Sequence, residues 1–254
     1  MDRNGARPGP LGTKVKSPAE GRAPVDPTRW SRYAKTALGQ GTIRTIFDSW
    51  TYQQVTLGYL LQHRPPPARV LSIGCGVGLY DILLEGWGYK VTSVDNDPMV
   101  LESARELGRS FGLDRDLREA DAFDLSEHHG RFDVAYSAGL VEHWHGERTA
   151  ELIAEHARCA PLVQVEVPTR HTLVLPDAMP EVLADAHLYR PREFVGRVKE
   201  AGLSVVKAYP IGPVPGRRRE ILESLVPPAL FRRLQLWTGH SMGVGVLASV
   251  PGPG

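Results

Sequence analysis

Short apolar runs and helical apolar patterns alternate along this chain from about residue 70 onward. Val70 to Ile73 predicts a short buried strand, and apolar residues return at helical spacing from Leu79. Lys90 to Asp95 repeats the strand pattern, and Pro98 then opens a second helix. This order of strands and helices is typical of an α/β fold with a mostly parallel sheet and helices on both faces.

The C-terminal half of the chain continues the alternation. Strands and helices are predicted at 162–168, 191–201, 203–209, 222–237 and 242–250. Pro191 and Gly202 mark the beginning and the end of the helix over 191–201, whereas Pro227 and Pro228 interrupt the later helical run. Residues 169–190 form an insertion, because a usual connection has about 2 to 6 residues.

Two segments precede this alternation. Residues 1–28 are rich in Gly, Pro, Arg and Ala, and we expect a disordered leader because so few large apolar residues cannot offset the entropy of ordering. Residues 29–66 concentrate six aromatic side chains, and apolar residues from Ile43 to Trp50 follow helical spacing. We interpret this stretch as a helical cap or lid on the sheet.

Composition narrows the class of protein. The 254 residues, 42% hydrophobic, suffice for one α/β domain over 67–254 with its cap. A net charge of +1 provides no field for nucleic acid or a membrane, and no apolar run reaches the about 20 residues that span a bilayer. Cys75 and Cys159 lack the spacing of a zinc site or a disulfide framework, so we expect a soluble cytoplasmic protein without a metal.

Three glycines at alternate positions, Gly74, Gly76 and Gly78, separate the first predicted strand from its helix. Glycine permits positive φ and lets a ligand lie against the main chain, and the helix that follows presents free N–H groups. The next strand ends in Asp95, about 20 residues further on, where a carboxylate can accept both hydroxyls of a ribose. These residues predict a site for a nucleotide-like ligand.

The glycine turn resembles motif I of the class I S-adenosylmethionine-dependent methyltransferases. A dinucleotide-binding turn would carry glycine where this chain has Leu79. The resemblance implies a Rossmann-like seven-stranded sheet whose antiparallel last strand lies between the fifth and sixth strands. It also implies S-adenosylmethionine as methyl donor, S-adenosylhomocysteine as product, and an acid where this chain has Ser72.

Further stretches follow in the order that this family shows, so that the resemblance covers residues 68–210. Asp95 lies in the second motif and would hold the ribose, and Asp121 lies in the third and would bind the adenine amino group. Glu142-His143-Trp144 resembles a signature of the family's small-molecule branch. The residues assigned to the donor are Gly74, Cys75, Gly76, Gly78, Asp95, Asn96, Asp121, Ala122 and Ser137.

Candidates for contact with the methyl acceptor lie in the cap, after the fourth strand and in the insertion. His143 and His187 are candidate catalytic bases, since imidazole is largely neutral at cellular pH; a structural hydrogen bond is the competing interpretation of each. The aromatic candidates are Tyr33, Tyr52, Trp144 and Tyr189. Aromatic residues of a cap also serve to pack it on the sheet, so each of these has a structural alternative.

The sequence favours methyl transfer to oxygen or nitrogen, or to carbon, of a small aromatic or heterocyclic metabolite. Base methylation is disfavoured, because Ala138 and Gly139 stand where a Pro-Pro-aromatic stretch would follow the fourth strand. RNA or protein acceptors stay open because of the basic leader and Arg217 to Arg219. An NAD(P)-dependent oxidoreductase and a non-catalytic donor-binding subunit also stay open. The leucines of 222–237 would cover either the sheet or the partner in a homodimer.

Overall fold

A computed structural model describes residues 42–171, 185–212 and 225–252. The predicted leader over 1–28, Tyr33, most of the insertion and Arg217 to Arg219 lie outside the described residues, and the predictions made for them stay predictions.

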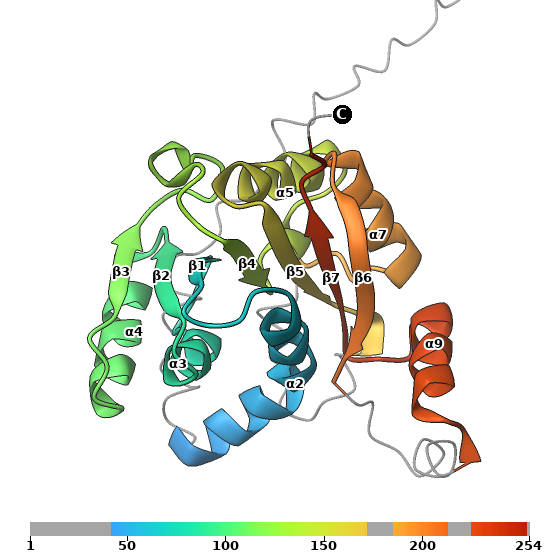
Figure 1. Ribbon diagram of the computed structural model, residues 1–254, viewed down its shortest axis with the longest axis horizontal. Helices are drawn as coiled ribbons and strands as arrows, with labels where there is room; N and C mark the ends of the chain where they lie inside the picture. The colour runs from blue at the N-terminus through green and yellow to red at the C-terminus, as the bar shows by residue number, and fades with distance from the viewer. Residues whose placement is uncertain (1–41, 172–184, 213–224, 253–254) are drawn as a thin grey trace, which may run out of the picture.

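The sheet has seven strands in the order β3-β2-β1-β4-β5-β7-β6 (Figure 1). The strands are β1 (Arg69–Ile73), β2 (Lys90–Asp95), β3 (Asp116–Glu119), β4 (Val134–Ala138), β5 (Leu162–Pro168), β6 (Ser204–Ile211) and β7 (Gly243–Ser249). Strands β1 to β5 pair in parallel, and β7 pairs antiparallel with both β5 and β6. The predicted Rossmann-like sheet, with its last strand between the fifth and sixth, is confirmed.

Helices cover both faces of the sheet (Figure 1). They are α2 (Thr42–His63), α3 (Leu79–Gly86), α4 (Pro98–Ser110), α5 (Glu147–Cys159), α7 (Pro191–Glu200) and α9 (Pro228–Thr238), with short 3-10 turns η2 (Ser126–His128) and η3 (Val141–His143). Helices α2 and α3 form one core with Val70 and Tyr136. Helices α5 and α7 form another with Leu71 and Ala135, the alternate residues of the same strands.

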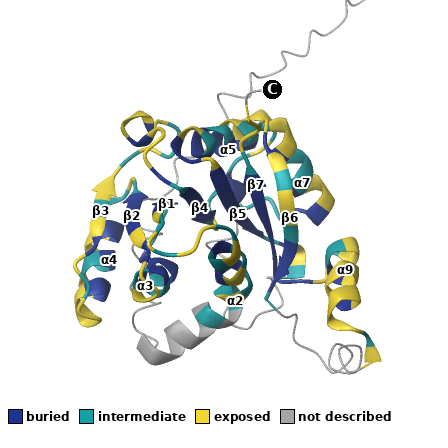
Figure 2. Ribbon diagram, viewed as in Figure 1, coloured by how far each residue is buried: buried dark blue, intermediate teal, exposed yellow. Residues whose placement is uncertain are grey.

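The central strands are buried on both faces, as Figure 2 shows. Strands β1, β4 and β5 are covered by helices on either side, which explains their nearly continuous apolar sequences. The predicted helical cap is α2, whose Leu57 and Leu60 are fully buried against the sheet. Sequence patterns located the elements around the glycine turn well because proline and glycine mark their ends.

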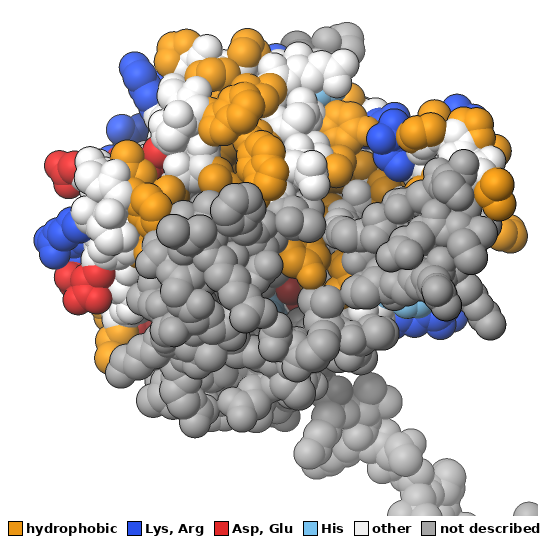
Figure 3. All heavy atoms as spheres, turned by 90° about the horizontal axis from the view of Figure 1, so that it is seen from below, with side chains coloured by type: hydrophobic (Ala, Val, Ile, Leu, Met, Phe, Trp, Pro, Cys, Tyr) orange, Lys and Arg blue, Asp and Glu red, His pale blue; other side chains and the backbone are white. Residues whose placement is uncertain are grey.

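Helix α9 corrects one expectation. Only Phe231 and Gln235 of this helix are buried, while Leu230, Leu234 and Trp237 are exposed. Leu230 and Leu234 therefore do not cover the sheet, whereas half-buried Leu236 packs against the core. Hydrophobic and basic side chains lie next to one another at the right of the view in Figure 3. A dimer contact stays a prediction. Within the described part of the chain, no helix combines the length and apolar character that crossing a membrane needs.

Candidate active site

The glycine turn between β1 and α3 has positive φ at all three glycines, 63° at Gly74, 55° at Gly76 and 68° at Gly78. A Cβ on Gly74 would lie 2.7 Å from a Leu140 methyl carbon, and one on Gly78 would lie 2.3 Å from the Arg115 guanidinium. A Cβ on Gly76 would meet nothing within 4 Å. The turn is thus packed at both ends and open at Gly76, where a ligand can approach the main chain.

Asp95 ends β2 beside the open part of the turn. Its Oδ2 accepts a hydrogen bond from Gly76 N at 3.0 Å, and its Oδ1 accepts one from Asp97 N at 3.1 Å. Burial raises the pKa of Asp95, and these backbone hydrogen bonds oppose the rise. Each carboxylate oxygen keeps a second acceptor position, so the fixed carboxylate suits the two hydroxyls of a ribose.

The side chain of Arg115 packs against the glycine turn. Its side chain is 1% exposed, and its Nη2 donates to Asp81 Oδ2 at 2.8 Å and to Ser93 Oγ at 3.1 Å. Its Nη1 donates to Val77 O at 3.4 Å, which ties the guanidinium to the turn itself. Nothing in the local sequence around Arg115 marks this role, because its partners lie on α3 and β2.

The remaining predicted donor residues lie around this turn. Cys75 is half-buried, its amide donates to Val94 O at 3.0 Å, and burial raises the pKa of its thiol well above the usual value. Asn96 is exposed directly after Asp95. Asp121 is exposed after β3 and accepts from Phe123 N at 2.9 Å, while half-buried Ala122 packs against the core. Their donor contacts stay predictions.

The side chain of Ser137 is engaged on the α5 face, and its contact with the donor stays a prediction. It is fully buried, and its hydroxyl lies 2.9 Å from His156 Nε2 on α5. His156 Nδ1 lies 2.8 Å from Leu152 O, so Nδ1 carries the hydrogen and Nε2 accepts from Ser137. Burial lowers the pKa of His156 to about 4, which keeps the ring neutral. The Ser137 side chain is therefore hydrogen-bonded to α5, and only the backbone of this residue remains available to the donor.

The two candidate histidines lie in segments that meet after β4. His187 N donates to Glu142 O at 2.8 Å, and His143 Nδ1 lies 3.2 Å from Asp185 Oδ1. Because Leu140 packs against Gly74, the start of this loop contacts the glycine turn. His187 Nε2 lies 2.6 Å from Glu193 Oε1 on α7, which supports a structural role for this ring.

Glu142 is buried in the same loop, with 2% of its surface exposed. Its Oε2 has no hydrogen-bond partner, and burial raises the pKa of its carboxyl to about 8. Such a group is protonated at neutral pH and can donate as well as accept.

The described aromatic candidates differ in surroundings. Tyr189 is 2% exposed, its hydroxyl lies 3.1 Å from Thr149 Oγ1, and its ring packs on Phe194, which supports its structural alternative. Acceptor contact by Tyr189 stays a prediction. Trp144 is half-buried and meets Phe123 edge to face. Tyr52 is half-buried on α2, and its ring lies so close to Gly212 that a Cβ there would be 2.6 Å away. Acceptor contact by Trp144 and Tyr52 stays a prediction.

A buried polar cluster between α2 and the sheet was missed from the sequence. Glu166 of β5 is 4% exposed, and its Oε1 accepts hydrogen bonds from the hydroxyls of Thr56 and, at 3.2 Å, of Tyr209. Gln164 Nε2 donates to Tyr209 OH at 2.8 Å and to Thr56 O at 3.1 Å. The signal was present, because Gln164 and Glu166 interrupt an otherwise apolar strand at alternate positions.

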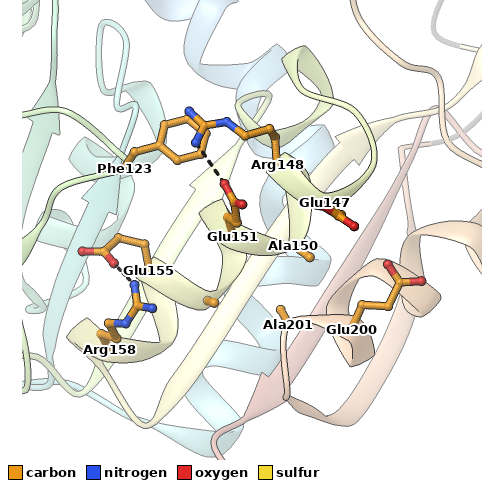
Figure 4. Close-up of a pocket in the computed structure, with 10 residues that line it drawn as sticks. Phe123, Glu147, Arg148, Ala150, Glu151, Glu155, Arg158, Glu200 and Ala201 are labelled. Carbon is orange, nitrogen blue, oxygen red and sulfur yellow. Dashed lines mark hydrogen bonds and ion pairs between the residues drawn. The ribbon is translucent and has the colours of Figure 1, made fainter. Parts of the chain in front are cut away.

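A groove of about 740 Å³ lies on the far side of α5 from the sheet, and Figure 4 shows its lining. Arg148 stands over the Phe123 ring at 3.9 Å and also pairs with Glu151, while Arg158 pairs with Glu155. None of the glycine-turn residues lines it. Among the described residues, no group of three or more His, Cys, Asp or Glu side chains is arranged to hold a metal ion.

Comparison with known proteins agrees with this geometry. Residues 70–160 match the model of a methyltransferase domain. The chain is 35% identical over 103 residues, 41% of its length, to a protein-L-isoaspartate O-methyltransferase of Chlorobium limicola, covering 47% of that protein. It is 35% identical over 80 residues to a ubiquinone biosynthesis O-methyltransferase of Xanthomonas axonopodis pv. citri, covering 31% of this chain and 34% of that one. The chain thus spans less than half of either relative.

A solved structure reproduces the fold over more of the chain. The magnesium protoporphyrin IX methyltransferase of Synechocystis PCC 6803, determined with bound S-adenosylmethionine, superposes with a TM-score of 0.55 at 15% identity. The superposition covers 88% of this chain and 90% of that one. The strand order and the glycine turn with Asp95 are those of the class I S-adenosylmethionine-dependent methyltransferase fold, and residues 70–160 match a methyltransferase domain. The cofactor of this class is S-adenosylmethionine.

Proposed function

We propose that this protein transfers the methyl group of S-adenosylmethionine to oxygen or nitrogen, or to carbon, of a small aromatic or heterocyclic metabolite in the cytoplasm. The observation that carries the proposal is the glycine turn, which is open at Gly76 and faces the fixed carboxylate of Asp95. Contact between Leu140 of the loop after β4 and Gly74, and the approach of His143 in that loop to Asp185, support an acceptor site beside the turn.

Each part of the site has a defined task in this proposal. S-adenosylmethionine supplies an activated methyl group, so the protein mainly aligns the reacting atoms. Asp95 accepts the ribose hydroxyls, Asp121 accepts from the adenine amino group, and the main chain at Gly76 borders the amino-acid end. His143 takes the proton that an oxygen or nitrogen nucleophile loses, and Asp185 at 3.2 Å orients its ring.

Relatives support a small acceptor. The names of the ubiquinone biosynthesis enzyme and the protoporphyrin methyltransferase both refer to small molecules with conjugated rings. A protein acceptor is the second candidate, because one relative is named for L-isoaspartate in proteins. RNA and a nicotinamide cofactor gain no comparable support from these relatives.

A ligand panel tests the donor. S-adenosylmethionine, S-adenosylhomocysteine, NAD and NADP are each added to the whole protein, and the unfolding midpoint is recorded. A ligand present at about 100 times its dissociation constant stabilises the native state by about 2.7 kcal/mol. The proposal requires that only the two adenosyl compounds raise the midpoint. A shift with NAD or NADP alone contradicts it.

The acceptor class is tested with the same protein and methyl-labelled donor. Labelled product from a panel of phenols and heterocyclic amines supports a small acceptor. Label found only in protein substrates that contain isoaspartate supports the second candidate and overturns the first.

A further inference from the structure

Ser72 shares a face of the sheet with two residues of the neighbouring strands. Ser72 of β1 pairs with Tyr136 of β4, and Ala138, two residues further along β4, pairs with Glu166 of β5. Alternate residues of a strand point to the same face, so Ser72, Tyr136 and Glu166 all point toward α2 and α3. Ser72 is neutral, so β1 places no charge on this face.

Glu166 is a buried carboxylate without a cation. Only 4% of its surface is exposed, and no ion pair among the described residues includes it. Its partners are all neutral and are the hydroxyls of Thr56, Tyr209 and Tyr136 and the side-chain amide of Gln53. Desolvation makes an unmatched buried charge costly, so a cationic ligand would be strongly favoured here.

Unpartnered polar groups surround this carboxylate. The hydroxyl of Tyr80 and the Oε1 of Gln53 are buried without a hydrogen-bond partner. After burial, the charge of Glu166 is the next cause that raises the pKa of Tyr80 and of Tyr136, so both phenols lie close to it. The rings of the two tyrosines lie 4.4 Å apart, and both oxygens can accept as well as donate.

Tyr80 connects this cluster to the donor site. It is the second residue of α3 and follows the glycine turn directly, so the cluster begins where the turn ends. Gln53 and Thr56 belong to α2, which covers this face. The cluster is therefore bounded by the turn on one side and by the cap helix on the other.

We propose that Glu166 binds the α-ammonium group of the methyl donor and thereby supplies, from β5, the negative charge that Ser72 does not supply from β1. This assignment rests on the proposed donor binding. An ammonium group carries three donors and no acceptor, which matches a cluster of one carboxylate, one amide oxygen and two phenol oxygens. The aromatic faces of Tyr80 and Tyr136 add a favourable surface for a cation.

The test compares three ligands in calorimetry. S-adenosylhomocysteine has the ammonium group, its deaminated analogue keeps the carboxylate but lacks the ammonium, and 5′-methylthioadenosine lacks the whole amino-acid end. Glu166→Gln keeps the shape of the side chain and removes its charge. Glu155→Gln is the matched control, because Glu155 is equally buried but is paired with Arg158 on α5.

Glu166→Gln should weaken the binding of S-adenosylhomocysteine by about 10-fold or more, since the lost interaction is a charge-assisted hydrogen bond. The affinities of the other two ligands should stay unchanged. Glu155→Gln should bind all three as the wild type does. Equal weakening of all three ligands by Glu166→Gln, or no weakening, overturns the assignment. If the wild type binds none of them, the proposed donor itself is wrong, which is a separate outcome.

A pH series on the wild type covers the case in which Glu166→Gln does not fold. Burial raises the pKa of Glu166 to about 7, so its charge appears as pH rises from 6 to 8. The titratable groups that face it are Tyr80 of α3, Tyr136 of β4 and Tyr209 of β6, and burial raises the pKa of each phenol well above this range. Among the described side chains of α2, those that contact it are the neutral Gln53 and Thr56.

Over this range the preference for S-adenosylhomocysteine over its deaminated analogue should rise about 10-fold, as one carboxyl ionises. Taking the ratio of the two affinities cancels effects of pH on the rest of the fold. A ratio that stays constant from pH 6 to 8 overturns the assignment.

Discussion

Buried carboxyl groups lie on both sides of the glycine turn, and they differ in whether a cationic side chain pairs with them. Asp81 on α3 is 1% exposed and is matched by Arg115 at 2.8 Å. Glu142 and Glu166, beyond β4, are nearly as deeply buried and enter no ion pair among the described residues. The matched charge maintains the shape of the donor side. The unmatched carboxyl groups, of which Glu142 is protonated at neutral pH, are where a ligand or a proton can bind.

The largest effect is expected from breaking the matched pair. Arg115→Ala leaves Asp81 buried without its cation and should lower the free energy of unfolding by about 3 to 5 kcal/mol. Urea unfolding measures this loss. Arg118→Ala, which removes an exposed pair with Asp116, should cost less than about 1 kcal/mol. Equal losses of unfolding free energy in the two variants would contradict the idea that the buried ion pair stabilises the fold more than the exposed one.

The unmatched Glu142 should make stability depend on pH. Its pKa is raised to about 8 in the folded state and is about 4.3 in an unfolded chain. Between these values the unfolded state has lost a proton that the native state keeps, so this carboxyl lowers stability as pH rises, by about 1.4 kcal/mol per unit. Glu142→Gln should therefore gain stability over the wild type from pH 5.5 to 7.5. Parallel stability curves would contradict the buried neutral carboxyl.

The smallest effect concerns a carboxylate of the donor side that caps a helix. Asp97 caps α4, and its Oδ1 accepts from Met99 N at 2.9 Å and from Val100 N at 3.4 Å. Asp97→Ala should lower the free energy of unfolding by about 1 kcal/mol, and Asp97→Asn by less. Thermal unfolding of both variants checks this, and a loss as large as that of Arg115→Ala would mean that Asp97 does more than cap.

The donor side could be predicted from sequence because its signals are local. Three glycines, one acid at a strand end and Pro98 at a helix start lie within about 25 residues of one another, and the backbone itself forms most of the site. The insertion after β5 was also visible as a long connection. The resemblance to a known family then predicted the order of the strands in the sheet.

The acceptor side could not be predicted as fully, because its contacts join distant residues. Helix α5 was not predicted, because Thr149, Glu155 and His156 interrupt its buried apolar stripe. In addition, Gly146 precedes the helix and provides no side-chain cap. The turn of Ser137 toward His156 and the approach of Thr56 to Glu166 depend on tertiary packing alone. Polar residues inside an apolar strand, as in β5, were the available sign of a buried polar cluster.

The central claim, that the glycine turn and Asp95 hold the methyl donor, is tested most directly by calorimetry with S-adenosylhomocysteine. Asp95→Ala should weaken binding by about 100-fold or more, since two charge-assisted hydrogen bonds to the ribose are lost. Asp133→Ala, which removes an exposed pair with Arg69, should bind as the wild type does. Wild-type affinity in Asp95→Ala, with the fold intact by circular dichroism, would contradict the account.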